Sequence, residues 1–115
     1  MDMPAPKFDY DVLHESAHQA EAFLKALANR NRLLILCHLV GGEMSVRELE
    51  DALNLRQPTL SQQLARLRDD GLVATRRESK NIYYSIASPE AEDIISRLYE
   101  LYCSPAARAK RGAGS

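Results

Sequence analysis

A short helix, a tight connection, a second helix and a charged hairpin follow one another between residues 45 and 87, and this order restricts the fold more than any other feature of the chain. Ser45 and Glu48 have the spacing of a capping box, which predicts a helix that runs to about Asn54. Pro58 predicts a second helix over residues 57–70, because proline is tolerated at the first helical position. Branched and aromatic side chains over 72–77 and 81–87 predict the two strands of a hairpin.

Further helices are predicted on both sides of this unit. Apolar residues recur at spacings of three and four from Leu13 to Leu27, which predicts an amphipathic helix over residues 11–28. Residues 33–40 are apolar nearly all round and predict a central helix. A last helix is predicted from Ser88 to about Cys103, because Pro105 should prevent its extension.

These elements predict a mainly α protein with a small β-hairpin (α+β), namely a winged helix-turn-helix fold with five helices and a two-stranded wing. Residues 1–10 are expected to be a flexible N-terminal arm, residues 11–103 the winged helix-turn-helix domain, and residues 104–115 a disordered basic tail. A chain of 115 residues has a modest core, so association with a second copy is plausible from size alone.

Net charge does not identify a nucleic-acid-binding protein here, because 15 Lys and Arg are set against 16 Asp and Glu. The argument depends on where the polar groups lie. In the helix over 57–70, Leu60, Leu64 and Leu67 should face inward, which leaves an outer face of hydrogen-bonding side chains suited to bases and phosphates. The predicted DNA-binding residues are Gln57, Thr59, Ser61, Gln62, Gln63 and Arg66 of the helix and Arg77, Lys80 and Asn81 of the hairpin. The alternative is a solvated helix face in a protein that binds no DNA.

The residues from Leu27 to Leu36, from Leu49 to Leu53, from Gln57 to Val73 and from Ile82 to Ile86 together resemble the ArsR/SmtB family of bacterial repressors. The resemblance covers residues 11 to about 103. It implies a homodimer formed through the first and last helices, which binds operator DNA, expected to be an inverted repeat, and leaves it when an inducer acts.

Metal sensing is common in that family, but the residues that carry it there are not found in this sequence. Val46 to Leu53 contain no Cys, and no His follows His38. His14 and His18 lie four positions apart, but two ligands do not complete a tetrahedral site. We therefore expect no metal and no cofactor.

Cys37 and Cys103 are the two cysteines of the chain, and their positions resemble the persulfide-sensing (BigR/SqrR-like) dithiol branch. That resemblance implies that reactive sulfur species join the two sulfurs and lower operator affinity. A buried structural thiol remains the alternative for Cys37, and a peroxide- or metal-responsive repressor with structural cysteines is the alternative function. The sequence leaves open which cysteine attacks first.

Two further expectations concern function class and location. An enzyme is not expected, because the chain has no C-x-x-C pair and no Cys with a base and an orienting acid. With no signal peptide and no apolar run long enough for a bilayer, we expect a cytoplasmic protein without membrane contact.

Overall fold

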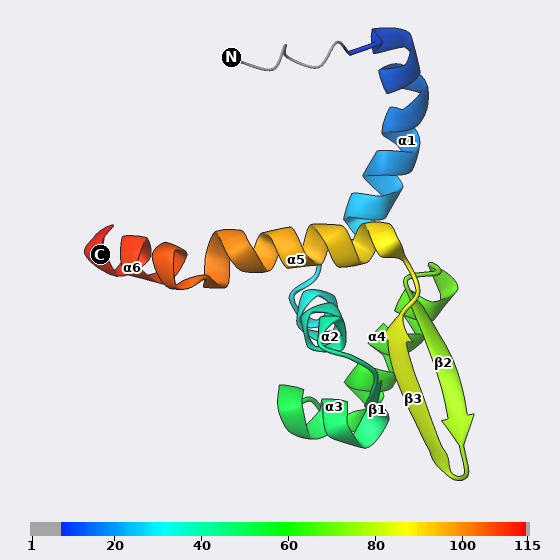
Figure 1. The fold of residues 1–115 in the computed structure, drawn as a ribbon. Helices are drawn as coiled ribbons and strands as arrows, with labels where there is room; N and C mark the ends of the chain where they lie inside the picture. The colour runs from blue at the N-terminus through cyan, green and yellow to red at the C-terminus, as the bar shows by residue number, and fades with distance from the viewer. Residues whose placement is uncertain (1–7, 115) are drawn as a thin grey trace.

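The computed structural model describes residues 8–114, with side chains up to residue 112. Most of the predicted flexible arm, residues 1–10, lies outside this range. The winged helix-turn-helix order is confirmed, and the elements are drawn in Figure 1. The helices are α1 (Tyr10–Leu27), α2 (Arg30–Val40), α3 (Val46–Leu53), α4 (Gln57–Asp69), α5 (Pro89–Cys103) and α6 (Pro105–Gly114), and the strands are β1 (Met44–Ser45), β2 (Val73–Glu78) and β3 (Asn81–Ile86).

The wing hairpin belongs to a sheet of three strands. β2 and β3 form the expected antiparallel hairpin, with Thr75 opposite Tyr84 and Glu78 opposite Asn81. β1 pairs with the other edge of β3, Met44 opposite Tyr84, so that the strand order is β1-β3-β2. The two-stranded wing is confirmed, and β1 was not predicted because a two-residue strand has too little pattern to be identified from sequence.

The core lies around α2, which is in contact with α3, α4, α5 and the wing strand β3. The inward positions predicted for α4 are confirmed, since Leu60, Leu64 and Leu67 are all buried. Ile35 of α2 and Ile95 of α5 complete the link between the helix-turn-helix unit and the last long helix. α5 therefore rests on the same core that holds α4 in place.

The residues predicted to be a disordered tail form a sixth helix, α6, which makes the prediction of five helices wrong. Ser104 has an extended backbone and accepts a hydrogen bond from Ala107 N at 3.1 Å, so it acts as the N-cap. Pro105 ends α5 as predicted, but it also occupies the first turn of α6, where its missing N–H has no cost.

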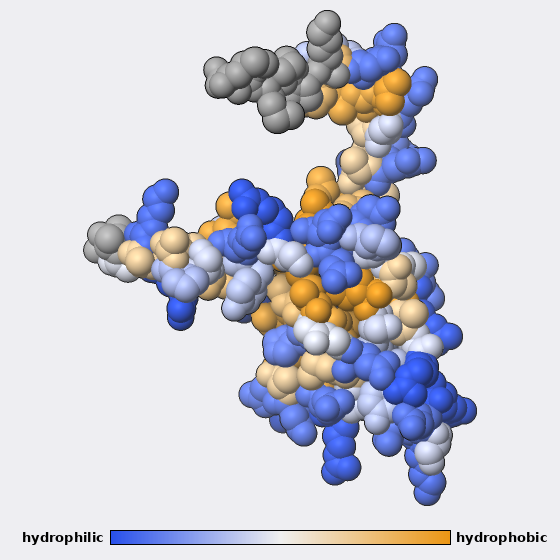
Figure 2. Space-filling model, viewed as in Figure 1, coloured by the Kyte–Doolittle hydropathy of each residue, from blue (hydrophilic) through white to orange (hydrophobic). Residues whose placement is uncertain are grey.

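α1 stands away from the rest of the molecule, attached at its C-terminal end (Figure 1). Of its residues only Ala26 and Leu27 are buried, whereas Leu13 and Leu24 are 48% and 58% exposed. Hydrophobic side chains accordingly gather on the surface of α1 and where α2 passes beneath α5 (Figure 2). Within residues 8–114 no helix combines the length and the hydropathy that a bilayer crossing needs.

Candidate DNA-binding face and dithiol cavity

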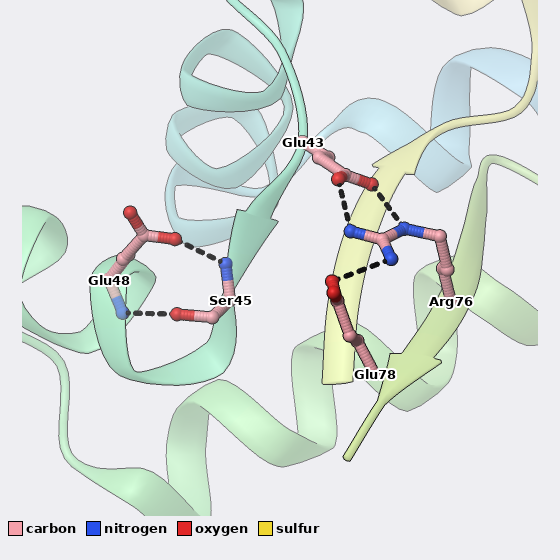
Figure 3. Close-up of polar contacts among 5 residues, drawn as sticks. All are labelled: Glu43, Ser45, Glu48, Arg76 and Glu78. Atoms are coloured by element: carbon pink, nitrogen blue, oxygen red, sulfur yellow. Dashed lines mark hydrogen bonds and ion pairs between the residues drawn. The ribbon is translucent and has the colours of Figure 1, made fainter. Parts of the chain in front are cut away.

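The turn between α3 and α4 fixes the angle at which α4 is presented. Asn54 ends α3 in the left-handed conformation, with φ 55°, and donates its N–H to Glu50 O at 2.9 Å. α3 begins with the predicted capping box: Ser45 N donates to Glu48 Oε1 at 2.9 Å and Glu48 N donates to Ser45 Oγ at 3.1 Å (Figure 3). Both ends of α3 are thus held by local hydrogen bonds.

The outer face of α4 carries exposed polar side chains. Thr59, Gln62 and Arg66 are exposed, and Arg66 Nε lies 3.4 Å from Asp70 Oδ2 one turn later. Arg56 precedes the helix and makes no side-chain capping bond. The first turn of α4 therefore keeps free backbone N–H groups next to the polar face, an arrangement suited to phosphate oxygens.

A groove of about 300 Å³ lies between this helix-turn-helix unit and the wing. It brings together three predicted DNA-binding residues, Gln57 from the start of α4 and Lys80 and Asn81 from the wing tip. Arg47 of α3 lines the same groove and was not predicted. It stands between the two capping-box residues, and only the fold shows that this position faces the wing.

Gln57 is held at the edge of this groove by neighbours on both helices. When its amide oxygen accepts from Ser61 Oγ at 3.0 Å, its Nε2 donates to the two carboxylate oxygens of Glu50 at 2.9 and 3.2 Å. This orientation satisfies both ends of the amide. The bond links α3 to α4 across the turn, so Gln57 and Ser61 are oriented before any ligand binds.

Gln63 differs from the other predicted DNA-binding residues of α4 because it is half-buried. Its Oε1 accepts from Arg32 Nη1 at 3.2 Å. The same guanidinium donates to Ala26 O at 2.8 Å and to Lys25 O at 3.3 Å, which are carbonyls of the last turn of α1. Gln63 therefore ties α4 to the end of α1.

Arg76 of β2 lies in an ionic cluster with Glu43 and Glu78 (Figure 3). Its guanidinium donates to Glu43 at 2.6 and 3.2 Å and to Glu78 at 2.9 Å, and it stacks 4.8 Å from the centroid of the Tyr83 ring. The hydrogen bond to Arg76 lowers the pKa of Glu43, and the bonds to Glu43 and then Glu78 raise the pKa of Arg76. Arg77, on the next position, is exposed.

The two cysteines are free and line one cavity of about 180 Å³ between α2 and α5. Cys37 is half-buried in α2, and Cys103 is exposed at the last residue of α5, two positions before α6 begins. Among the described residues, no charged side chain lines this cavity. The remaining lining residues are Leu33, Ile95, Leu98, Tyr99 and Tyr102.

The surroundings of Cys37 disfavour its thiolate. Burial raises the pKa of the Cys37 thiol, and the neighbouring Cys103 raises it further by charge repulsion. Both sulfurs belong to the lining of the same cavity. Sequence reasoning placed one cysteine on each element, and the fold brings both to the same cavity.

The two histidines considered as metal ligands are both on α1, at positions 14 and 18, and both are exposed. Throughout the range 8–114 there is no cluster of three or more His, Cys, Asp or Glu side chains placed to hold a metal ion.

Residues 29–75 match the family model described as bacterial regulatory protein, arsR family. Over 94 residues the chain is 47% identical to the biofilm growth-associated repressor of Agrobacterium fabrum, in an alignment that covers 82% of this chain and 80% of the relative. The chain belongs to the ArsR family.

Two solved structures of transcriptional regulators are similar to this ArsR-family protein in both sequence and fold. Reduced HlyU from Vibrio cholerae is 46% identical with a TM-score of 0.77, over 80% of this chain and 97% of HlyU. The transcriptional repressor BigR from Xylella fastidiosa is 39% identical with a TM-score of 0.78, over 84% of this chain and 99% of BigR. The ArsR-family protein is a DNA-binding transcriptional regulator, not an enzyme, and it fits the BigR-like branch.

Proposed function

We propose that this regulator is a repressor that binds operator DNA as a homodimer and leaves it when reactive sulfur species join Cys37 to Cys103. One observation carries the proposal: the two cysteines come from different helices, 66 positions apart (103 − 37), and line one uncharged cavity. Packing alone gives no reason for an exposed cysteine at the end of α5.

The chemistry balances with a persulfide, RS–SH, as the co-reactant. One cysteine thiolate attacks the terminal sulfur of RS–SH, so that a protein persulfide forms and RS⁻ leaves. The second cysteine then attacks the protein-bound sulfur of that persulfide and expels HS⁻, which leaves a disulfide. The two cysteine thiols are oxidised and the transferred sulfur is reduced to sulfide. If both cysteines first take up a sulfur atom, the same displacement leaves a trisulfide.

A covalent link between α2 and α5 would reach the DNA-binding face through the core. α2 is in contact with α3 and α4, so a shift of α2 is passed to both helices of the DNA-binding unit. Because the two half-sites of an operator are separated by about one helical turn, roughly 34 Å, a small change in the spacing of two α4 helices lowers affinity.

The homodimer is supported by the exposed apolar side chains of α1 and α5. Leu13, Ala17, Ala20 and Leu24 lie along one face of α1 and line a shallow groove of about 420 Å³. On α5, Ile94 and Leu101 are 40% and 50% exposed. A second copy that covers both stripes would remove this apolar surface from water.

Binding of operator DNA is supported by the polar face of α4 and by the groove beside it, which is lined by two cations, Arg47 and Lys80, and one carboxylate, Glu50. Gln62 and Arg66 present the donors and acceptors that match adenine and guanine edges in the major groove. Lys80 and Arg47, which line one groove, are positioned for phosphates on the flanking backbone.

The test is operator binding, measured by fluorescence anisotropy with the reduced protein and repeated after treatment with a persulfide, with hydrogen peroxide and with zinc. Intact mass is measured on each sample. We expect release by persulfide, with a mass that shows loss of two hydrogens and the gain of zero or more sulfur atoms, and no release for Cys37→Ser or Cys103→Ser. Release of both variants by persulfide, or release of the wild type by zinc alone, contradicts the proposal.

A further inference from the structure

We infer that Cys103 is the thiol that takes sulfur from the donor and that Cys37 is the resolving thiol that closes the bridge. This inference rests on the proposed function, because it assigns different roles to the two cysteines of the same cavity. It follows from four features of the described residues: exposure, the lining of the cavity, the protonation of Cys37 and the position of Cys103 on α5.

Accessibility differs between the two sulfurs. Cys103 is exposed at the end of α5, whereas Cys37 lies half-buried on α2, packed against the hydrophobic core and sharing the cavity with Ile95 of α5. A donor in solution meets Cys103 without any movement of the protein. Attack on Cys37 requires the donor to enter the cavity between the two helices.

The lining of the cavity makes that entry unfavourable for an anionic donor. Leu33, Ile95 and Leu98 offer no hydrogen bonds from their side chains, and the lining drawn from the described part of the chain carries no charge. A peptide persulfide such as glutathione persulfide would lose hydration of its carboxylates there, and the lining residues include no cation to replace that hydration. The cavity of about 180 Å³ accommodates one or two bridging sulfur atoms far more readily than a tripeptide.

Protonation acts in the same direction. The thiolate is the attacking species, and burial together with Cys103 raises the pKa of Cys37, so that this residue is mostly the thiol at neutral pH. Once Cys103 carries the persulfide, Cys37 can react with that protein-bound sulfur and needs no donor from solution. Its attack on the Cys103 sulfur is intramolecular, which compensates for weak ionisation. The proton of the Cys37 thiol leaves with the expelled sulfide as H₂S.

The proposed dimer leaves Cys103 available. Ile94 is nine residues before Cys103, which is about two and a half turns of helix and places the two on opposite sides of α5. Leu101 lies on the side of Ile94 for the same reason, whereas Tyr99 shares the side of Cys103 and lines the cavity. A partner bound to the Ile94 and Leu101 stripe therefore does not cover the attacking sulfur.

The experiment follows the first sulfur transfer with glutathione persulfide at one equivalent. The wild-type homodimer is quenched with an alkylating agent at early times, and peptide mass mapping locates the added sulfur. In parallel, Cys37→Ser and Cys103→Ser are treated in the same way. We expect the added sulfur on Cys103 in the wild type, its accumulation on Cys103 in Cys37→Ser, and a reaction about tenfold slower in Cys103→Ser.

Early labelling of Cys37 in the wild type, or a Cys103→Ser rate equal to the wild-type rate, overturns the inference. The wild-type mapping does not depend on any variant folding, and the reduced variants are checked by circular dichroism. Operator binding separates the two ideas. If sulfur is transferred first to Cys103 but the bridged protein does not release DNA, the proposed function is contradicted and the order of attack is supported. If the protein releases DNA but sulfur is transferred first to Cys37, the order of attack is contradicted and the proposed function is supported.

Discussion

Glu43 and Arg76 are joined by two hydrogen bonds, of 2.6 and 3.2 Å, that connect the turn after α2 to strand β2 of the wing. The residues are 33 positions apart in the sequence. Because Glu43 follows α2 by three residues, the position of the wing depends on the end of the helix that carries Cys37. The bidentate geometry also removes Arg76 from the set of cations free to bind DNA.

Glu43→Gln should loosen the wing. We expect faster amide hydrogen exchange in β2 and β3 and a loss of operator affinity of no more than about fivefold, since exposed ion pairs are individually weak. The same loosening should occur in the wild type at acid pH. The pKa of Glu43 is lowered by Arg76, so the contact is complete above the ordinary carboxylate pKa and is lost as the pH falls through the lowered value. The control is Arg97→Gln, which breaks a pair on α5; equal exchange in the two variants would contradict this role.

The left-handed residue at the turn between α3 and α4 gives a second prediction. Asn54→Ala should destabilise the protein by about 1 kcal/mol, because alanine tolerates this conformation less well than asparagine, and Asn54→Gly should be neutral or stabilising. Urea unfolding at one fixed protein concentration measures both. If the two variants unfold at the same urea concentration, the conformation of Asn54 does not limit stability.

Substitutions in the groove should lower affinity for all DNA, whereas a substitution on the outer face of α4 should lower specificity for the operator. Lys80→Ala and Arg47→Ala should weaken binding to all sequences alike and reduce the dependence of log affinity on log salt by about one unit each. Gln62→Ala should instead cost about 1–3 kcal/mol on the operator and little on unrelated DNA. Arg108→Ala on α6 is the matched control, and a salt dependence lowered as much by this change would contradict a phosphate site in the groove.

The exposed stripe of α1 predicts the oligomeric state. Leu13→Glu with Leu24→Glu should convert the dimer to monomer in analytical ultracentrifugation and abolish operator binding, because two carboxylates would be buried in the interface. Gln19→Glu adds one carboxylate outside the apolar stripe of α1 and should leave the dimer intact. A dimer that survives the double substitution would require a different interface.

The raised pKa of Cys37 predicts a pH dependence for its reactivity. In Cys103→Ser the repulsion from Cys103 is absent but burial, the larger cause, remains. Alkylation of Cys37 should therefore still accelerate at a pH where a free cysteine peptide has reached its maximal rate. A profile that coincides with that of the peptide would show that Cys37 is more solvated than the structure indicates.

Local sequence signals predicted most of the fold and the elements that carry the candidate site residues. The capping box at Ser45 and Glu48 and the buried leucines of α4 depend only on near neighbours, and both are confirmed. α6 was missed because Pro105 was interpreted only as a stop, although proline also starts helices. Local signals did not predict long-range contacts such as Glu43–Arg76, because that contact depends on how the sheet strands are paired, and Cys37 and Cys103 were paired only through the family resemblance.

Arg32 joins three helices, with its guanidinium bonded to the last turn of α1 and to Gln63 on α4. If the proposed dimer forms through α1, subunit pairing and DNA binding by α4 would share this one side chain, so a change in one would affect the other. In a chimaera that carries α4 of a relative, we expect α1 to keep its position only if residue 63 still provides a hydrogen-bond acceptor for Arg32. Fewer substitutions in α4 should therefore be able to change operator preference than the number of exposed positions on this helix suggests.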